Sequence, residues 1–308
     1  MKKLVTLLMV VLTISTFTSC SLKKDTVTSG ADDKLVYSNL IDEESKVMLG
    51  SVLKKAEIDQ NHIDGALSLI NDYNKHMTVF NEADKDYMEE SDLFAFQSGF
   101  TTTEDSYINY GDYYFQMKKW YNGRDYNDAY CRTLAFLLMQ DAIQVESPLK
   151  KEHWGVSNED DFLYGDYATL TDYELVDIKE DKYPAYFTLF HPVFDTDKKE
   201  GFVKQIQDQW KKFAVSFDNS AASLITIWSV IEKESGVKIE HSHVGVLIEN
   251  DDGLLFIEKT NPLAPYQMTK FSTTEQLKQY LVDTSTACYE KYDLPVPEMI
   301  VLRNDNEI

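Results

Sequence analysis

Cysteine is rare in this sequence: the chain of 308 residues contains three. Exported domains that depend on disulfides carry more cysteines in fewer residues, so a disulfide framework is excluded as the basis of the fold. The two cysteines beyond residue 20, Cys131 and Cys288, leave two alternatives open. They can form a single disulfide, or one of them can be a reactive thiol.

Positive charge is scarce as well. The chain has 30 Lys and Arg residues against 52 Asp and Glu residues, which gives a formal net charge of −22. A surface this acidic lacks the basic stripe that neutralises phosphate groups, which argues against nucleic acid as a partner and against electrostatic attachment to anionic lipid. Attachment to a membrane would therefore depend on a covalent lipid.

The N-terminal segment has the order of charged, apolar and small residues that is typical of a secretory signal. Two lysines precede an apolar run over residues 4–12, which is too short to span a bilayer. Residues 17–20 read Phe-Thr-Ser-Cys and resemble the lipobox of bacterial lipoproteins, in which a cysteine is diacylated and exposed by cleavage. We therefore expect a signal peptide at 1–19, a lipid on Cys20, a flexible polar tether at 20–34, and a location on the extracytoplasmic face of the cell membrane.

Hydrophobic spacing divides the remaining chain into two regions. Between residues 34 and 77, apolar residues recur at helical spacing in two runs, which predicts two amphipathic helices with Asn61 as a cap of the second. Residues 80–122 are acidic and rich in Tyr without a sustained period, which predicts irregular structure packed by its aromatics. We expect a helical and aromatic N-terminal region at 35–123, packed on a core at 124–308.

Local patterns predict further elements within the core. The clearest is a β-hairpin, in which the strand-like runs 243–248 and 254–258 flank an Asn-Asp-Asp-Gly turn. The others are a strand at 186–190, a helix near 202–213, a buried strand or helix at 221–230, a strand at 266–271, and a helix at 273–282 opened by Ser272 or Thr273.

A nucleophilic cysteine is the chemistry that these pieces can assemble. Cys131 lies in the first turn of an apolar segment that predicts a buried helix, and Asp125, Asn127 and Asp128 are candidates to cap it. The positive end of the helix dipole and the free N–H groups there stabilise a thiolate and can hold an oxyanion. The alternative is that Cys131 is a small buried hydrophobe with no chemical role.

The predicted hairpin can supply a base and a group that orients it. If Glu249 pairs with Leu254, then Gly245 opposes Glu258, and His243 shares their face because side chains alternate along a strand. Diagonal neighbours on one face lie roughly 7 Å apart, which a long carboxylate can bridge.

Other assignments stay open. His241 lies two residues before His243, on the same predicted face, and is a rival base. Asn261 or Gln267 can replace Glu258 as the orienting group. The sequence offers no metal-ligand spacing beyond one His-x-His pair, and no phosphate loop or dinucleotide fingerprint, so we expect neither a metal nor a cofactor.

The sequence resembles two known protein families at these residues. His243-Val-Gly-Val-Leu followed by Gly253-Leu-Leu-Phe-Ile-Glu258 resembles the core of NlpC/P60 and related papain-like cysteine peptidases and amidases, which implies Cys131 as nucleophile, His243 as base and Glu258 as orienter. The span from about 37 to 306 resembles a bacterial lipoprotein family of unknown function, DUF4300. The motifs that carry this second resemblance are Tyr37-Ser-Asn-Leu40, Asn71-Asp-Tyr-Asn74, Cys131-Arg132, His243-Val-Gly-Val-Leu, Phe256-Ile-Glu-Lys259 and Pro265-Tyr-Gln267.

We therefore expect an α+β fold with a papain-like (NlpC/P60-like) core, an antiparallel sheet and an N-terminal helical region. The expected function is that of a cysteine hydrolase, amidase or transferase acting on an amide bond, with a cell-wall peptide as substrate. Arg132 and Gln267 are candidate substrate contacts, although for Arg132 a salt bridge on the acidic surface is favoured over a substrate contact.

The alternative function is a non-catalytic surface lipoprotein that binds a solute or a protein partner. It predicts that Cys131 is buried and far from His243, or is bonded to Cys288. The enzyme predicts the sulfur near His243 in an open cleft, with Cys288 elsewhere.

Overall fold

A computed structural model describes residues 34–90, 97–103, 105–108, 110, 113–159, 161–196, 201–218, 221–233, 236–250 and 253–308. The predicted signal peptide, Cys20 and all of the tether except Lys34 lie outside the described residues. Within the described ranges, no helix is long and apolar enough to cross a membrane.

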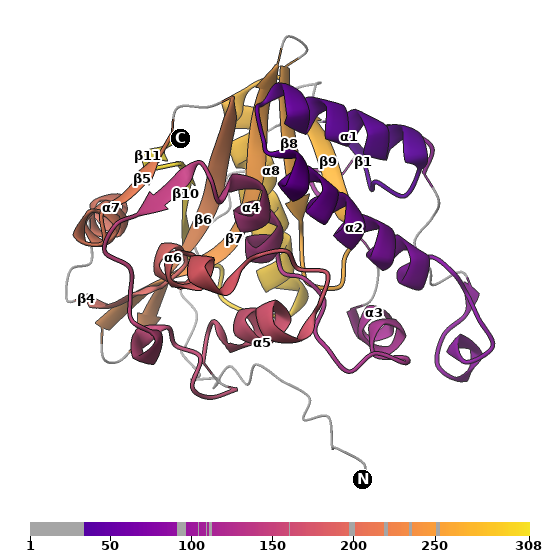
Figure 1. Ribbon diagram of the computed structural model, residues 1–308, viewed down its shortest axis with the longest axis horizontal. Helices are drawn as coiled ribbons and strands as arrows, with labels where there is room; N and C mark the ends of the chain where they lie inside the picture. Colours follow the sequence, from indigo (N-terminus) through magenta and orange to yellow (C-terminus); the bar gives the residue numbers. More distant parts are fainter. Residues whose placement is uncertain are drawn as a thin grey trace.

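One antiparallel sheet organises the molecule, and nine of the described strands belong to it (Figure 1). Eight of them run in the order β11-β10-β6-β7-β8-β9-β1-β2, and β4 pairs with β7 off this path. The strands of this sheet are β1 (Leu35–Ser38), β2 (Thr101–Thr103), β4 (Val193–Thr196), β6 (Ala222–Lys233), β7 (Gly236–Asn250), β8 (Gly253–Lys259), β9 (Tyr266–Phe271), β10 (Glu298–Arg303) and β11 (Asn306–Glu307). A separate pair is formed by β3 (Ile143–Val145) and β5 (Val215–Phe217).

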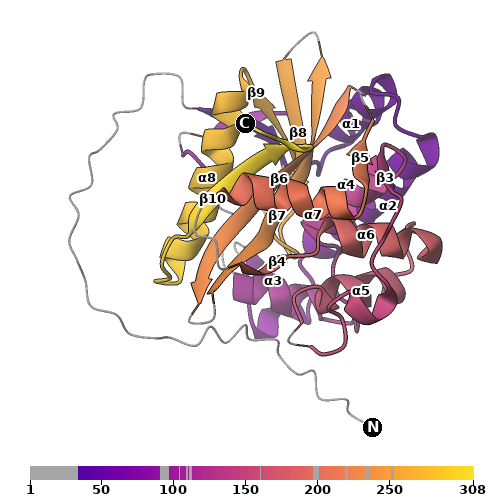
Figure 2. The same ribbon diagram turned by 90° about the vertical axis from the view of Figure 1, so that its left-hand side faces the viewer.

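Helices cover both faces of this sheet. Figure 2 shows α8 on one face and α1, α2, α4, α5 and α6 on the other. The helices are α1 (Glu43–Lys55), α2 (Gln60–Met77), α3 (Tyr113–Trp120), α4 (Cys131–Met139), α5 (Tyr164–Asp172), α6 (Tyr183–Leu189), α7 (Phe202–Lys212) and α8 (Thr274–Lys291), with short 3-10 turns at Asp84–Asp86, Lys151–His153 and Glu180–Lys182.

Two hydrophobic clusters match the two faces. On the α8 face, Leu277 and Leu281 pack with Leu247 and Phe256 of the sheet. On the other face, α4 contributes an almost continuous apolar surface to the larger cluster, as its sequence predicted for a buried helix. The antiparallel sheet with helices on both faces confirms the expected α+β class.

The N-terminal region contains the two predicted helices, α1 and α2, and also adds strands to the sheet. β1 pairs with β9 of the core, and β2 pairs with β1. The region therefore continues the same sheet in addition to packing helices against it.

The prediction of irregular structure over residues 80–122 is wrong in part, because they contain β2 and α3. Two further local predictions are wrong. Residues 186–190 were predicted as a strand, but they belong to α6 and its C-cap. The aromatic residues of this segment recur at the spacing of one helical face: Tyr183, Tyr186, Phe187 and Phe190. The five residues 186–190 alone are too few to show this period. The second error concerns the cap of α2, which is Asp59 instead of Asn61, because the Asp59 side chain accepts a hydrogen bond from the Asn61 backbone N–H.

The predicted hairpin has the predicted register. β7 pairs with β8 so that Glu249 opposes Leu254 and Gly245 opposes Glu258. The predicted start of α8 is also confirmed, since Thr273 is its N-cap and accepts a hydrogen bond from the Gln276 backbone N–H.

Candidate active site

Cys131 is the first residue of α4, as its sequence pattern predicted. The N-cap is Tyr130, whose side chain makes no hydrogen bond to the helix. The prediction that a polar side chain between 125 and 128 caps the helix is wrong, because Asp128 turns instead toward Lys259, with 2.8 Å between Oδ2 and Nζ. No side chain therefore caps this helix start, and its positive end lies at the thiol.

His243 lies between Cys131 and Glu258. The side chains of Cys131 and His243 interact and shift each other's pKa, and His243 Nε2 lies 2.6 Å from Glu258 Oε2. Because the carboxylate engages Nε2, Nδ1 is the ring nitrogen left for the thiol. The structure thus brings the three predicted residues together in the order of nucleophile, base and orienter.

The Glu258 carboxylate is held on both of its oxygens. Gln267 Nε2 and Tyr280 OH each donate to Oε1 at 2.7 Å, and Tyr110 OH donates to Gln267 Oε1 at 2.8 Å. With 1% of its surface exposed, Glu258 depends on these partners for its orientation. Gln267, a candidate substrate contact and alternative orienter, is fully buried and orients Glu258 instead.

The electrostatics of the pair favour a thiolate beside an imidazolium. Burial alone raises the pKa of the Cys131 thiol, but the hydrogen bond to His243 and the charges of His243 and Arg132 outweigh it, so the pKa lies below its ordinary value. Burial alone lowers the pKa of His243, and its hydrogen bonds to Cys131 and Glu258 raise it to about 10. Both shifts favour the state in which the proton resides on the imidazole.

Arg132 forms a buried salt bridge with Asp166. Its Nε and Nη2 donate to the two carboxylate oxygens at 2.8 and 2.7 Å, and both side chains are nearly inaccessible. Of the two roles expected for Arg132, the structure shows the salt bridge, placed in the interior instead of on the surface. This bidentate pair fixes the first turn of α4 against α5.

His241 does not share the environment of His243. The register pairs His243 with Ile227 and His241 with Trp228, so Ser242 is an extra residue that forms a bulge. Because Ile227 and Trp228 face opposite sides of the sheet, the expectation that both histidines face one side is wrong. The His241 ring packs on Trp228, with 5.1 Å between ring centroids.

The remaining candidates lie apart from the triad. Asn261 Oδ1 accepts from the Leu263 backbone N–H at 3.0 Å and shapes the turn after β8. Both described cysteines are free, and Cys288 is exposed on α8, so the alternative disulfide is not formed. Among the described residues, no group of three His, Cys, Asp or Glu side chains is arranged to hold a metal ion.

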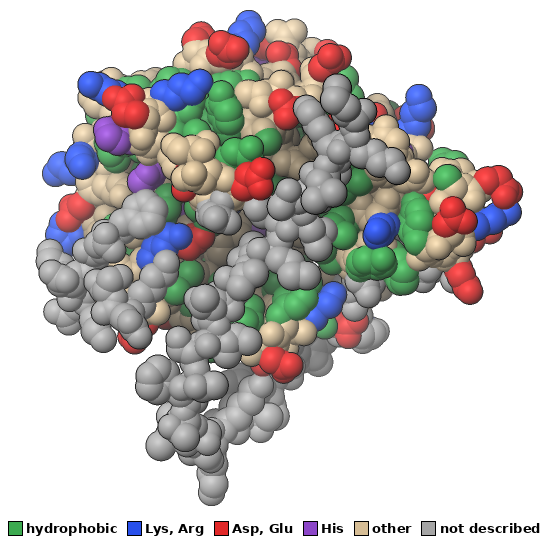
Figure 3. All heavy atoms as spheres, turned by 90° about the horizontal axis from the view of Figure 1, so that it is seen from below, with side chains coloured by type: hydrophobic (Ala, Val, Ile, Leu, Met, Phe, Trp, Pro, Cys, Tyr) green, Lys and Arg blue, Asp and Glu red, His purple; other side chains and the backbone are tan. Residues whose placement is uncertain are grey.

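Access to the thiol is narrower than the expected open cleft. Cys131 and His243 are each 8% exposed, so the thiol is buried, as the binding-protein alternative predicts, although it does not lie far from His243. Figure 3 shows acidic, basic and apolar side chains interspersed over the described part of the lower face.

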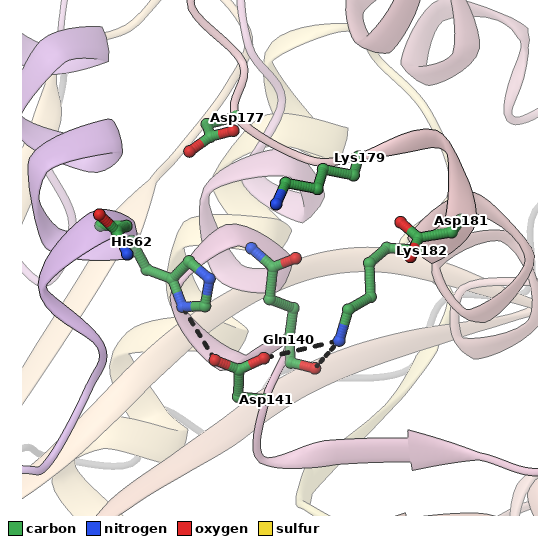
Figure 4. Close-up of a pocket in the computed structure, with 8 residues that line it drawn as sticks. His62, Gln140, Asp141, Asp177, Lys179, Asp181 and Lys182 are labelled. Atoms are coloured by element: carbon green, nitrogen blue, oxygen red, sulfur yellow. Dashed lines mark hydrogen bonds and ion pairs between the residues drawn. The ribbon is translucent and has the colours of Figure 1, made fainter.

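A hollow of about 440 Å³ lies at the opposite end of α4, around Gln140 and Asp141 (Figure 4). Its polar side chains engage one another: His62 Nδ1 and Lys182 Nζ each lie 3.5 Å from an Asp141 carboxylate oxygen. This hollow does not contain Cys131, His243 or Glu258.

Three site residues escaped prediction from sequence. Tyr110 and Asp166 lie in segments without a regular pattern, so their partners could not be inferred. Tyr280 carried a usable signal, because Leu277, Tyr280 and Leu281 recur at helical spacing and mark the face of α8 that packs on the sheet.

Comparison with known proteins gives a family and no reaction. Neither a curated protein nor a solved structure matches the chain. A family described as a domain of unknown function matches residues 36–308, which include every residue of the site above. The chain therefore belongs to the DUF4300 family.

Proposed function

We propose that this protein is a cysteine hydrolase, amidase or transferase that acts on an amide bond through an acyl-thioester. One observation carries the proposal: the side chain of Cys131, at the start of α4, interacts with His243, whose Nε2 lies 2.6 Å from the buried Glu258 carboxylate. Nucleophilic cysteine catalysis needs a thiolate, a proton carrier and a group that orients the carrier. A cysteine serving only as core filler needs none of these.

The reaction follows from the positions of these groups. The Cys131 thiolate attacks the amide carbon and forms the carbon–sulfur bond, while the carbonyl oxygen gains negative charge. His243 then gives its proton to the leaving nitrogen as the carbon–nitrogen bond breaks, and an acyl-thioester remains on Cys131. Water, or an amine in a transferase, attacks this thioester and loses its proton to His243; the carbon–sulfur bond breaks, the acid or the new amide leaves, and the Cys131 thiolate is restored beside the imidazolium.

The start of α4 supports stabilisation of the intermediate. Backbone N–H groups in the first turn of a helix have no intrahelical acceptor, and no side chain caps them here. An oxyanion formed at Cys131 would lie at the positive end of the helix dipole, the environment that stabilises developing negative charge.

The proposal extends to fold relationship and location. A cysteine that opens a helix, with His on one strand and Glu on the next, supports a papain-like core similar to that of NlpC/P60 enzymes. The lipobox-like residues 17–20 support a lipid on Cys20 and a location at the extracytoplasmic face of the membrane. A cell-wall peptide is then the substrate class within reach of the tethered enzyme.

Thiol labelling tests the core of this proposal. The purified protein is treated with iodoacetamide over a range of pH, and the modified cysteines are identified by peptide mass spectrometry. We expect Cys131 to react at a pH well below that of an ordinary thiol, and His243→Ala to slow this reaction. Cys131→Ser identifies the peptide that carries the signal.

The opposite result would favour the alternative function. If Cys131 reacts only at alkaline pH, and His243→Ala does not change the rate, His243 does not activate the thiol. A tethered binding protein would then be the better hypothesis.

A further inference from the structure

A second buried ion pair lies directly behind the site. Lys259 Nζ is 2.8 Å from Asp128 Oδ2, and both side chains are completely inaccessible. Desolvation of two charges is expensive, and replacement of such a pair by apolar residues is often neutral or stabilising. Stability alone therefore does not explain why the pair is present.

The Lys259 ammonium joins several segments of the chain. Besides Asp128, it donates to the Ala264 backbone carbonyl at 2.8 Å. The rings of Tyr73 from α2 and Tyr266 from β9 flank it, each with its centroid 4.1 Å from Nζ. These contacts connect β8, the turn that follows it, α2, and the segment that leads into α4.

The two partners are close in sequence to the triad. Asp128 precedes Cys131 by three residues, and Lys259 directly follows Glu258 in β8. Asp128 also accepts a hydrogen bond from the Ala129 backbone N–H at 2.7 Å, so its carboxylate holds the chain just before the helix start. The charge of Lys259 also interacts with Cys131.

We propose that the Lys259–Asp128 ion pair is a positioning device that ties the segment leading into Cys131 to the strand that carries Glu258. This inference rests on the proposed function, because it gives the pair a role in holding the thiol at the imidazole. Lys259 and Asp128 are positioning residues, since neither touches the reacting atoms. A displacement of reacting groups by about 1 Å can reduce a rate by about a hundredfold.

The chain offers a matched control. Lys119 and Asp84 form another ion pair whose side chains are almost completely buried. It joins α3 to the 3-10 turn at Asp84–Asp86, and these elements contain no residue of the triad. Lys119→Met therefore removes a buried ammonium without touching the proposed device.

The experiment compares Lys259→Met, Asp128→Ala, Asp128→Asn and Lys119→Met by the rate of Cys131 labelling at about pH 8, because burial raises the pKa of Asp128 to about 7 and its carboxylate is charged above that pH. We expect Lys259→Met and Asp128→Ala to slow labelling about tenfold or more. Asp128→Asn should slow labelling less than Asp128→Ala does, because its one amide oxygen can accept from Lys259 while the contact with the Ala129 N–H is lost. Lys119→Met should leave the rate unchanged, even if it lowers the Tm by as much as Lys259→Met does.

Three results would overturn the inference. Lys259→Met and Lys119→Met both label Cys131 at the rate of the unmodified protein, both label it slowly, or Asp128→Ala labels it faster than the unmodified protein does. The last would show that the Lys259 charge acts alone, without positioning. If Lys259→Met does not fold, the neutral pair made by Lys259→Met with Asp128→Asn takes its place, and a rate equal to that of the unmodified protein would count against the proposal.

Failure of the inference and failure of the proposed function are distinguishable. His243→Ala reports on the function by itself. If His243→Ala slows labelling and Lys259→Met does not, only the positioning role is lost.

Discussion

Glu258→Gln is the substitution that examines the triad most directly, because it removes one charge and changes little volume. Gln267 and Tyr280 both donate to Oε1, so the new amide should keep its oxygen toward them and point its NH₂ group at His243. His243 Nε2 must then accept a hydrogen bond, which moves the ring proton to Nδ1, on the side of Cys131. In that tautomer the imidazole cannot take the proton of the thiol.

The magnitude follows from the lost charge-assisted hydrogen bond. Such a bond contributes about 1.5–3 kcal/mol, and about 1.4 kcal/mol corresponds to one pKa unit, so the pKa of His243 should fall by about one to two. The imidazolium that lowers the pKa of Cys131 is then less stable, and the onset of labelling moves to higher pH. At about pH 6 we expect the labelling rate to fall by about 10- to 100-fold.

The assay is iodoacetamide labelling of Cys131 across pH, with Glu249→Gln as the matched control. Glu249 is on the same hairpin but lies half exposed, 2.6 Å from Arg303 Nη1. Its substitution should leave the profile unchanged and should change stability by less than about 1 kcal/mol. A Glu258→Gln profile that coincides with that of the unmodified protein would refute the argument that the carboxylate sets the state of His243.

Other substitutions examine the frame around the site. Gly245→Ala would put its Cβ 2.3 Å from Phe256 Cζ and 2.7 Å from the Ile257 carbonyl oxygen. We expect the free energy of unfolding, measured by chemical denaturation, to fall by about 1–3 kcal/mol. An unchanged denaturation midpoint would contradict this crowding. Thr273→Ala removes the side-chain cap of α8 and should lower the free energy of unfolding by about 1 kcal/mol, seen as a lower Tm. Cys288→Ser should not change the labelling measured at about pH 6, because an ordinary exposed thiol is protonated there; mass spectrometry that finds Cys288 labelled first would contradict this.

Much of the site could be predicted because it depends on short-range rules. The register of the hairpin followed from its turn, and strand alternation then placed Glu258 with Gly245. The helix beginning at Cys131 followed from its apolar run. Each of these predictions uses residues only a few positions apart, where backbone geometry fixes the outcome.

Errors arose where distant contacts decide. Aspartate is a residue type that often caps helices, but the carboxylate of Asp128 contacts the buried ammonium of Lys259, which is far away in the sequence. The bulge at Ser242 moved His241 away from His243, and no local residue pattern announces it. The α6 aromatics are compatible with a strand over five residues and with a helix only over the longer span.

Two adjacent residues of β8, Glu258 and Lys259, point to opposite faces of the sheet and make the charged contacts on each face. Glu258 contacts His243 and Tyr280 on the α8 side, whereas Lys259 contacts Asp128 and Tyr73 on the α2 side. A slip of β8 by one residue would exchange these faces. An ammonium would then meet an imidazolium, and a carboxylate would meet the buried Asp128, so both contacts would be repulsive. The charges that the proposed reaction needs therefore also oppose the wrong register of the strand that carries them.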